Sequence, residues 1–188
     1  PVTDFTVDAD LYNANKKSDR DGDGIACGLV SLMRIDRAHG VVEIGNVVLG
    51  PRLQRTTAAT EAMSLLARHV FDLGYRRLEW KCDSLNAPSR RAAGRLGFAH
   101  EGTFRRHVVT KGRSRDTAWF AMTVDDWPRV RAAHEAWLEP ANFVGGVQQR
   151  RLAEQVRRQI RQLDVVAVAI IAARSTTPFS SKSLPGHR

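Results

Sequence analysis

Apolar and polar residues alternate in a way that predicts two strands near the start of the folded part of the chain. Residues 25–35 and 41–49 are apolar and rich in β-branched side chains, which is typical of strands. A turn at residues 39–40 would join them as a hairpin. Residues 57–73 instead carry apolar side chains at helical spacing, so they predict a helix that ends at Gly74.

Similar patterns continue along the rest of the chain. The later elements are predicted over residues 77–83 (a strand), 88–96 (a short helix), 103–110 and 116–124 (a hairpin turning at Lys111-Gly112), 128–138 (a helix capped by Asp125 or Asp126) and 147–173 (a second long helix). The four tryptophans, Trp80, Trp119, Trp127 and Trp137, are expected to fill the core. Because strands and helices alternate, the fold class is expected to be α/β.

Composition indicates one globular domain. The 188 residues are 43% hydrophobic and 26% charged, and the net charge is +9. Residues 147–188 hold eight Lys/Arg and two acids, so we attribute most of the positive charge to the tail. The two cysteines, Cys27 and Cys82, are not in metal-ligand spacing and no signal peptide is recognisable, so a cytoplasmic protein with reduced thiols is expected.

Two strand-to-helix junctions are candidates for a ligand site. The first follows the strand over residues 43–50, and the second follows the strand over residues 77–82 and contains Asn86, Pro88 and Ser89. Ligands bind at the carboxyl ends of strands in open α/β sheets, where helix N-termini favour phosphate groups. The two junctions together predict a cleft for a long, phosphate-bearing ligand.

Several short motifs, in this order, carry a resemblance to a known family. They are Glu43-Ile-Gly-Asn46, Thr60-Glu-Ala-Met-Ser-Leu-Leu66, Gly74-Tyr-Arg-Arg-Leu-Glu-Trp80, Asn86-Ala-Pro-Ser89, Leu96-Gly-Phe98 and Glu101-Gly102. Over residues 28–146 the chain resembles the GNAT superfamily of acyl-CoA-dependent N-acetyltransferases. More narrowly, it is similar to the branch that acetylates the amino termini of ribosomal proteins.

The resemblance implies a mixed central sheet flanked by helices over residues 25–146. Family members open with a strand and one or two helices, which we cannot recognise in the irregular segment 1–24, so these amino-terminal elements are expected to be missing. Residues 147–174 are expected to form a basic amphipathic helical extension, and residues 175–188 a disordered tail.

The resemblance also implies acetyl-CoA as the acetyl donor, with no metal. The first junction would cradle its phosphates through Gln54, Arg55, Thr56, Thr57, Ala58 and Ala59. Arg55 and Thr57 stand where the family has the glycines of a Gly-x-Gly motif; the alternative is an ordinary capped helix without a ligand. The strand around Gly45 to Leu49 is expected to splay from its neighbour at Leu78 to Lys81 and to bind the pantetheine arm through Val47, Val48 and Leu49.

Roles near the thioester follow from the same resemblance. An N–H near Val47 or Val48 would polarise the thioester carbonyl, Asn86 would contact pantetheine, and Ser89 would protonate the departing thiolate. Many relatives use a tyrosine for this proton, at the position of Ala93 in this chain. The alternative is that Asn86 and Ser89 only cap the short helix.

The general base is the most open assignment. Glu43 is the candidate, because it is an acid on a strand that borders the cleft, and His107 and Glu101 are alternatives. Relatives that act on ribosomal proteins place a Glu where this chain has Val108. A purely structural, ion-paired role for Glu43 is an equal alternative.

An acidic run near the start of the chain and the basic helix near its end also bear on function. The run Asp19–Gly24 resembles the start of a calcium loop, but its twelfth position is Val30 instead of Glu, so a turn is the better interpretation. The basic helix could bind RNA, an anionic membrane surface or a second subunit to form a homodimer, or pack on the domain.

The expected function is acetyl transfer from acetyl-CoA to a primary amine by direct attack. The alternative is a non-catalytic GNAT scaffold that acts through its basic helix in RNA binding or oligomerisation.

Overall fold

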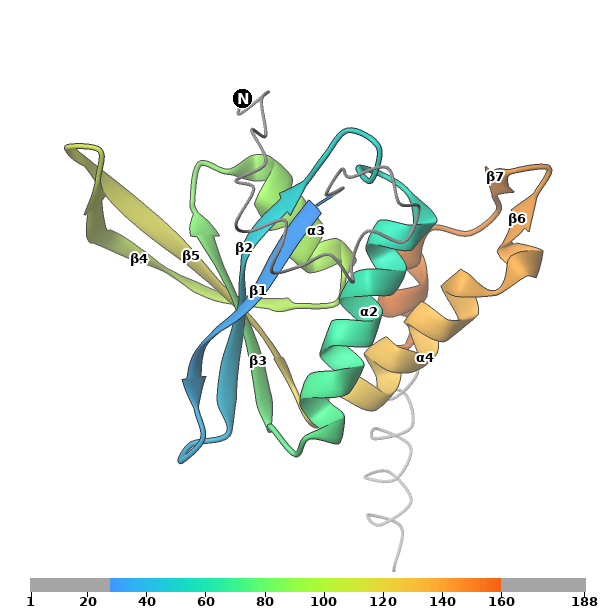
Figure 1. Ribbon diagram of the computed structural model, residues 1–188, viewed down its shortest axis with the longest axis horizontal. Coiled ribbons are helices and arrows are strands. Elements are labelled where there is room, and N and C mark those ends of the chain that lie inside the picture. The colour runs from blue at the N-terminus through green and yellow to red at the C-terminus, as the bar shows by residue number, and fades with distance from the viewer. Residues whose placement is uncertain (1–27, 160–188) are drawn as a thin grey trace, which may run out of the picture.

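The computed structural model describes residues 28–159, and Figure 1 shows how their helices and strands are arranged. In chain order the elements are β1 (Gly28–Asp36), β2 (Val41–Leu49), α2 (Thr57–Asp72), β3 (Arg77–Asp83), α3 (Ala87–Arg95), β4 (Ala99–Thr110), β5 (Arg113–Thr123), α4 (Trp127–Leu138), η2 (Pro140–Asn142), β6 (Phe143–Val144) and β7 (Val147–Gln148). Residues 152–159 are also helical. None of the helices in this part of the chain is long and apolar enough to cross a bilayer.

The main sheet has five strands in the order β1-β2-β3-β5-β4. Only the β2–β3 pair is parallel, while β1–β2, β3–β5 and β4–β5 are antiparallel. The helix α2 makes the crossover that a parallel pair requires. The expected α/β class with a mixed central sheet is therefore confirmed.

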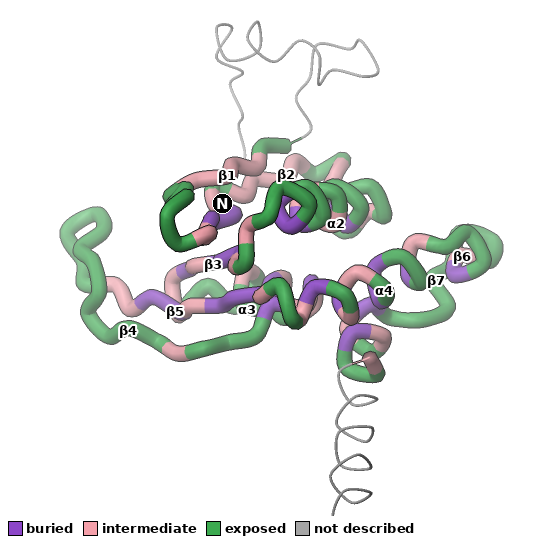
Figure 2. The backbone as a smooth tube through the Cα atoms, turned by 90° about the horizontal axis from the view of Figure 1, so that it is seen from below, coloured by how far each residue is buried: buried purple, intermediate pink, exposed green. Residues whose placement is uncertain are grey.

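Helices α2 and α4 lie together on one side of this sheet (Figure 1). Side chains alternate between the two faces of a strand, and the residues that face these helices form the core, with Ile44, Leu78 and Met122 each at most 2% exposed. Between the helices, the rings of Phe71 and Trp127 stack at 5.2 Å. Figure 2 shows the contrast with β4, along which no residue is buried.

Most predicted elements are found within a few residues of their predicted bounds, with three differences. The carboxylate of Asp126 does not cap α4, because it accepts hydrogen bonds from the backbone N–H and the hydroxyl of Thr123. The last predicted helix does not begin at Val147, since Val147 and Gln148 pair with β6 and the helical segment begins at residue 152. Trp119 is only half-buried, whereas the other three tryptophans are in the core.

Leu152 and Val156 of the helical segment pack into the core, at 1% and 3% exposed. This segment of the basic extension therefore lies against the domain, as one of the alternatives above expected. The expectations for residues 1–27 and 160–188, including the acidic turn and the rest of the basic helix, lie outside the described residues.

A glycine permits α3 to lie close to α4. Gly97 follows α3 with a φ of +97°, and a Cβ atom there would lie 2.7 Å from Cγ1 of Val130 on α4. Any side chain at this position would meet both a backbone penalty and a steric clash. The Leu96-Gly97-Phe98 motif thus fixes the way in which α3 meets the core.

His134 on α4 is a neutral histidine in this core. It is 1% exposed, and its Nε2 donates a hydrogen bond to the carbonyl of Leu96 at 3.0 Å, because a carbonyl oxygen can only accept. Nδ1 has no partner among the described residues. The pKa of His134 is lowered to about 4, mainly by burial, which the hydrogen bond to the Leu96 carbonyl opposes and the nearby charge of Arg95 supports.

We expect the free energy of unfolding to decrease as the pH falls from about 6.5 to about 4, because the unfolded chain binds a proton there while folded His134 does not. The gap between the two pKa values corresponds to roughly 3 kcal/mol. Urea unfolding between about pH 7 and pH 4 measures it. His134→Gln should flatten this dependence, whereas His69→Gln, at an exposed position of α2, should not. An unchanged slope in His134→Gln would contradict the assignment.

Candidate functional site

The parallel strands β2 and β3 part from one another midway along their length. Pairing runs from Val41 opposite Arg77 to Ile44 opposite Trp80, and no pair follows, although β2 continues to Leu49. The expected splay is therefore present, and it begins after Trp80. Beyond this point the β3-facing edge of β2 has no strand partner within residues 28–159, which leaves backbone groups there for a ligand.

A β-bulge in β2 accompanies the split. Ser31 pairs with Gly45 and Leu29 with Val48, so β2 contains one more residue than β1 between these two pairs. Asn46, within the extra stretch, has a left-handed backbone with φ +50°. The bulge shifts the alternation of side chains by one residue. Val47 and Leu49 consequently line the helix side of the split, whereas Val48 does not.

The loop between β2 and α2 is held by its own hydrogen bonds. The side-chain amide of Gln54 donates to the carbonyl of Leu49 at 2.8 Å. Arg55 has a left-handed backbone, with φ +61°, which is the conformation that glycine adopts most readily. The chain therefore retains a glycine-like turn at one of the two positions where the family has its glycines.

Thr56 caps the start of α2. Its hydroxyl oxygen accepts the N–H of Ala59 at 3.2 Å and donates to the carbonyl of Leu53 at 2.8 Å. The N–H groups of Thr57 and Ala58, in the first turn, have no acceptor among the described residues. These donors and the helix dipole favour an anion at this end of α2.

The second junction places a serine hydroxyl beside the split. The side-chain oxygen of Asn86 caps α3 by accepting the N–H of Ser89 at 3.0 Å. The Oγ atom of Ser89 accepts a hydrogen bond from Nε1 of Trp80 at 3.0 Å, because an indole N–H can only donate. The hydroxyl proton of Ser89 therefore remains available to another acceptor.

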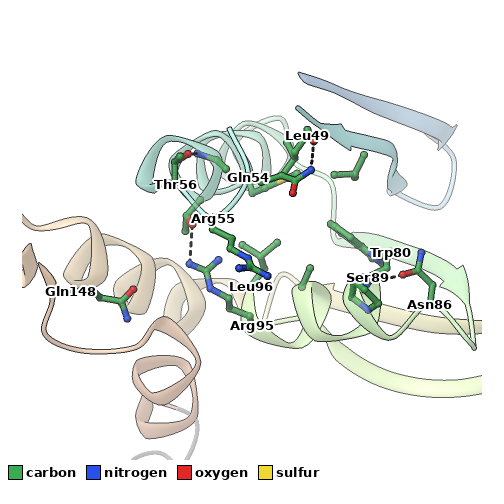
Figure 3. A pocket seen from close by; sticks show the side chains of 16 residues that line it. Leu49, Gln54, Arg55, Thr56, Trp80, Asn86, Ser89, Arg95, Leu96 and Gln148 are labelled. Atoms are coloured by element: carbon green, nitrogen blue, oxygen red, sulfur yellow. Dashed lines mark hydrogen bonds between the residues drawn. The ribbon is translucent and has the colours of Figure 1, made fainter. Parts of the chain in front are cut away.

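Both junctions open into one pocket of about 630 Å³, shown in Figure 3. Eight of the predicted site residues line it: Val47, Leu49, Gln54, Arg55, Thr56, Ala59, Asn86 and Ser89. Four others, Glu43, Val48, Thr57 and Ala58, do not. The pocket is also lined by residues that were not among the predicted site residues, namely Thr60, Met63, Trp80, Pro88, Ala92, Arg95, Leu96 and Gln148.

Arg95 is the most informative of these additional residues. Its guanidinium donates to the hydroxyl of Thr60 at 2.9 Å and lies 5.2 Å from the ring centroid of Trp137, and no carboxylate pairs with it in the described part of the chain. Burial lowers the pKa of Arg95, but a guanidinium stays protonated at neutral pH. Helical spacing could have indicated it, since Arg95 lies seven residues after Pro88 on the same face of α3.

Arg55 is a second cation in this pocket without a carboxylate partner among the described residues. Figure 3 shows its side chain and that of Arg95 in the space between α2 and α3. Two guanidinium groups and the open N–H groups of α2 make this end of the pocket suitable for phosphate.

Glu43 belongs to a buried ion-pair cluster on the face of the sheet opposite α2 and α4. Its Oε2 lies 3.0 Å from Nζ of Lys81 and 3.3 Å from Arg34, in neither case aligned as a hydrogen bond. Lys81 also contacts Glu79 on β3 at 2.8 Å. The pKa of Glu79 is lowered, since its bonds to Lys81 and Arg77 outweigh the opposing effect of burial. Sequence reasoning did not identify Glu79.

The other two candidate bases lie on β4. Glu101 forms a two-pronged hydrogen-bonded pair with the guanidinium of Arg77, which lowers its pKa and makes it a weak base. Nδ1 of His107 lies 3.0 Å from the hydroxyl of Thr117. No group of three His, Cys, Asp or Glu side chains suited to a metal ion is found within residues 28–159.

Comparison with known proteins agrees with this geometry. A family model described as the acetyltransferase (GNAT) domain matches residues 6–99, so the match includes part of the segment in which no family element was recognised. The crystal structure of a GCN5-related N-acetyltransferase from Brucella melitensis is 51% identical, with a TM-score of 0.69 over 73% of this chain and 63% of that one. That of a probable GNAT-family acetyltransferase from Chromobacterium violaceum is 50% identical, with a TM-score of 0.54 over 55% and 52%.

A curated relative is more distant. The SPbeta prophage-derived uncharacterized N-acetyltransferase YokL of Bacillus subtilis is 27% identical over 107 residues, which are 57% of this chain and 60% of that protein. The chain thus spans less than two thirds of the length of these relatives. None of their names specifies action on ribosomal proteins.

Replacing Asn86 tests its role as the N-cap of α3. Asn86→Ala should lower the free energy of unfolding by about 1 kcal/mol, because α3 loses its N-cap. Asn86→Asp keeps an oxygen that can accept the N–H of Ser89 and should leave stability within about 0.5 kcal/mol of the parent. Urea unfolding at neutral pH measures both values. Equal stability of the alanine variant and the parent would show that the cap contributes nothing.

Proposed function

Since this chain belongs to the GNAT family of acetyltransferases, we propose that it transfers an acetyl group from acetyl-CoA to a primary amine by direct attack. The observation that carries the proposal is that one pocket connects the phosphate-suited start of α2 with the split between β2 and β3. A long ligand with phosphates at one end and an amide-containing arm at the other fits this arrangement. The amine is that of a protein amino terminus or a small molecule.

The phosphate end of acetyl-CoA is assigned to the first junction. Arg55 and Arg95 offer charge-assisted hydrogen bonds, and the N–H groups of Thr57 and Ala58 offer further donors. The side chains of Gln54, Thr56 and Ala59 line the same end. An anion here would neutralise two cations that have no carboxylate partner among the described residues.

The acetyl end is assigned to the split. The open backbone edge of Val47, Val48 and Leu49 pairs with the amides of the pantetheine arm, and an N–H of Val47 or Val48 stabilises the carbonyl oxygen as charge develops on it. Asn86 contacts the arm. When the amine nitrogen bonds to the acetyl carbon, the carbon–sulfur bond breaks, and Ser89 gives its free hydroxyl proton to the departing thiolate.

The amine must also lose a proton, and Glu43 is the proposed acceptor, through water. Glu43 lies on β2 one residue before the end of β2–β3 pairing, so its carboxylate is next to the split. Its Oε2 lies 3.0 Å from Nζ of Lys81 and 3.3 Å from Arg34, so a carboxylate has two cations beside it. The same contacts would also serve a purely structural role, which kinetics can distinguish.

Calorimetric titration with acetyl-CoA tests the proposal, with ATP as a control for general phosphate binding. We expect micromolar, CoA-selective affinity, and the affinity of Arg95→Met should fall roughly tenfold or more through loss of a charge-assisted contact. Arg90→Met is the matched control, because Arg90 lies on the same helix but outside the pocket. Absence of both heat and thermal stabilisation at millimolar acetyl-CoA would overturn the proposal and favour a non-catalytic scaffold.

Glu43→Gln should lower kcat by about a hundredfold, because the amide cannot accept the amine proton. Glu79→Gln is the matched control, because Glu79 is also buried and shares Lys81, and its kcat should stay within about threefold of the parent. CoA release with the best amine of a screening panel gives kcat, and thermal unfolding gives the stability of each variant. Parallel losses of kcat and stability in both variants would instead show that Glu43 is structural.

A further inference from the structure

The hairpin formed by β4 and β5 carries a concentration of positive charge. Residues 104–116 contain five Lys/Arg and one acid, Asp116, whereas residues 1–146 as a whole carry a net charge of only +3. The domain outside this hairpin is therefore close to neutral. Although most of the net positive charge lies in residues 147–188, the domain thus has a cationic region of its own.

These cations have no ion-pair partners in the described part of the chain. Arg105, Arg106, Lys111 and Arg113 are exposed, and no carboxylate within residues 28–159 pairs with them. The one acid nearby is engaged elsewhere, since the carboxylate of Asp116 accepts the backbone N–H of Arg106 at 2.7 Å. An exposed group of unpaired like charges produces a field that attracts anions.

An aromatic cluster lies at the base of the hairpin. The rings of Phe104 and Trp119 stack at 4.8 Å, and His107 meets Phe104 edge-on at 5.5 Å. Phe104 is 51% exposed, so one side of this stack can receive a ligand. Nζ of Lys81 lies 3.9 Å from the ring centroid of Trp119.

This cluster is adjacent to the split but on the opposite face of the sheet from the pocket. Trp119 pairs with Lys81, the residue that follows Trp80, at which β2–β3 pairing ends. Since neighbouring side chains alternate, Trp80 lines the pocket while Lys81 and Trp119 face the other side. A donor in the pocket would present its acetyl group towards this second face through the split.

The outer edge of β4 is also available. β4 is the last strand in the order of the sheet, so its outer backbone groups have no strand partner among the described residues. An extended peptide can add to such an edge through main-chain hydrogen bonds. A peptide with carboxylate side chains would at the same time neutralise the hairpin.

Resting on the proposed function, we propose that the acceptor is an acidic peptide: the amino terminus of a protein with Asp or Glu among the residues that follow its amine. The peptide lies along the cationic β4–β5 hairpin, and its amine reaches the split beside the aromatic cluster. Polycationic amines, such as polyamines and aminoglycosides, are repelled by the same charges.

Kinetics with matched peptides test this inference. Two peptides begin with the same residue, and one continues with Glu where the other has Lys; spermidine is a third acceptor. We expect kcat/KM for the acidic peptide to be at least about tenfold higher at low salt, and the preference to shrink as ionic strength rises to about 0.5 M. Equal or better use of the basic peptide or of spermidine would overturn the inference.

Charge variants test whether the cations of the hairpin cause the preference for the acidic peptide. The double variant Arg105→Gln/Arg113→Gln should lose most of the preference for the acidic peptide while its affinity for acetyl-CoA stays unchanged. Arg68→Gln, which removes a cation from an exposed position of α2, should keep the preference. A preference that persists in the double variant would place the recognition elsewhere and contradict the inference.

Two measurements separate failure of this inference from failure of the proposed function. Lack of acetyl-CoA binding in the calorimeter would overturn the proposed acetyltransferase function. Fluorescence anisotropy of a labelled acidic peptide reports on the hairpin without any transfer reaction, and binding should weaken in the double variant. A single-stranded RNA that binds through these cations while the acidic peptide does not would overturn the inference and leave the acetyl-CoA site intact.

Discussion

The parting of β2 and β3 after Ile44 and Trp80 is the constraint on which the site depends. Paired parallel strands normally bond to one another through the backbone groups that face each other, which leaves no room for a ligand between them. Here a single extra residue near Asn46 bends β2 away and leaves part of one strand edge unused. The pocket lies at this opening, and both the turn into α2 and Ser89 line it.

The strands are held firmly just before they part. Glu43 on β2 and Glu79 on β3 are the pair before the last one, and both contact Lys81, so one ammonium group joins the two strands there. Separating charges of this kind inside a protein is costly, since each buried group depends on its partner. The cluster therefore holds β2 and β3 together up to the point where their pairing ends, and the strands separate only beyond it.

Periodicity in the sequence predicted most of the strands and helices, because a buried face gives most of these elements their repeat. Most of the residues that line the pocket near the start of α2 were also predictable, since capping residues and helix starts are local signals. A bulge is not such a signal: strict alternation cannot show that Val48 is excluded from the pocket while Val47 and Leu49 line it. Arg95 was missed because its surroundings, with Thr60 and Trp137 but no carboxylate from the described residues, come from α2 and α4. The cationic hairpin was missed because its charge is dispersed over two strands.

The free edge of β4 has a further consequence for the chain in solution. Long, exposed edge strands tend to pair with the same strand of another molecule, which leads to aggregation. In β4 the left-handed turn at Arg106 interrupts the regular edge, and two such hairpins brought together would set ten cations against each other. Self-association through this edge is thus discouraged by the same residues that would attract an acidic segment, and the strand stays open to a partner of opposite charge.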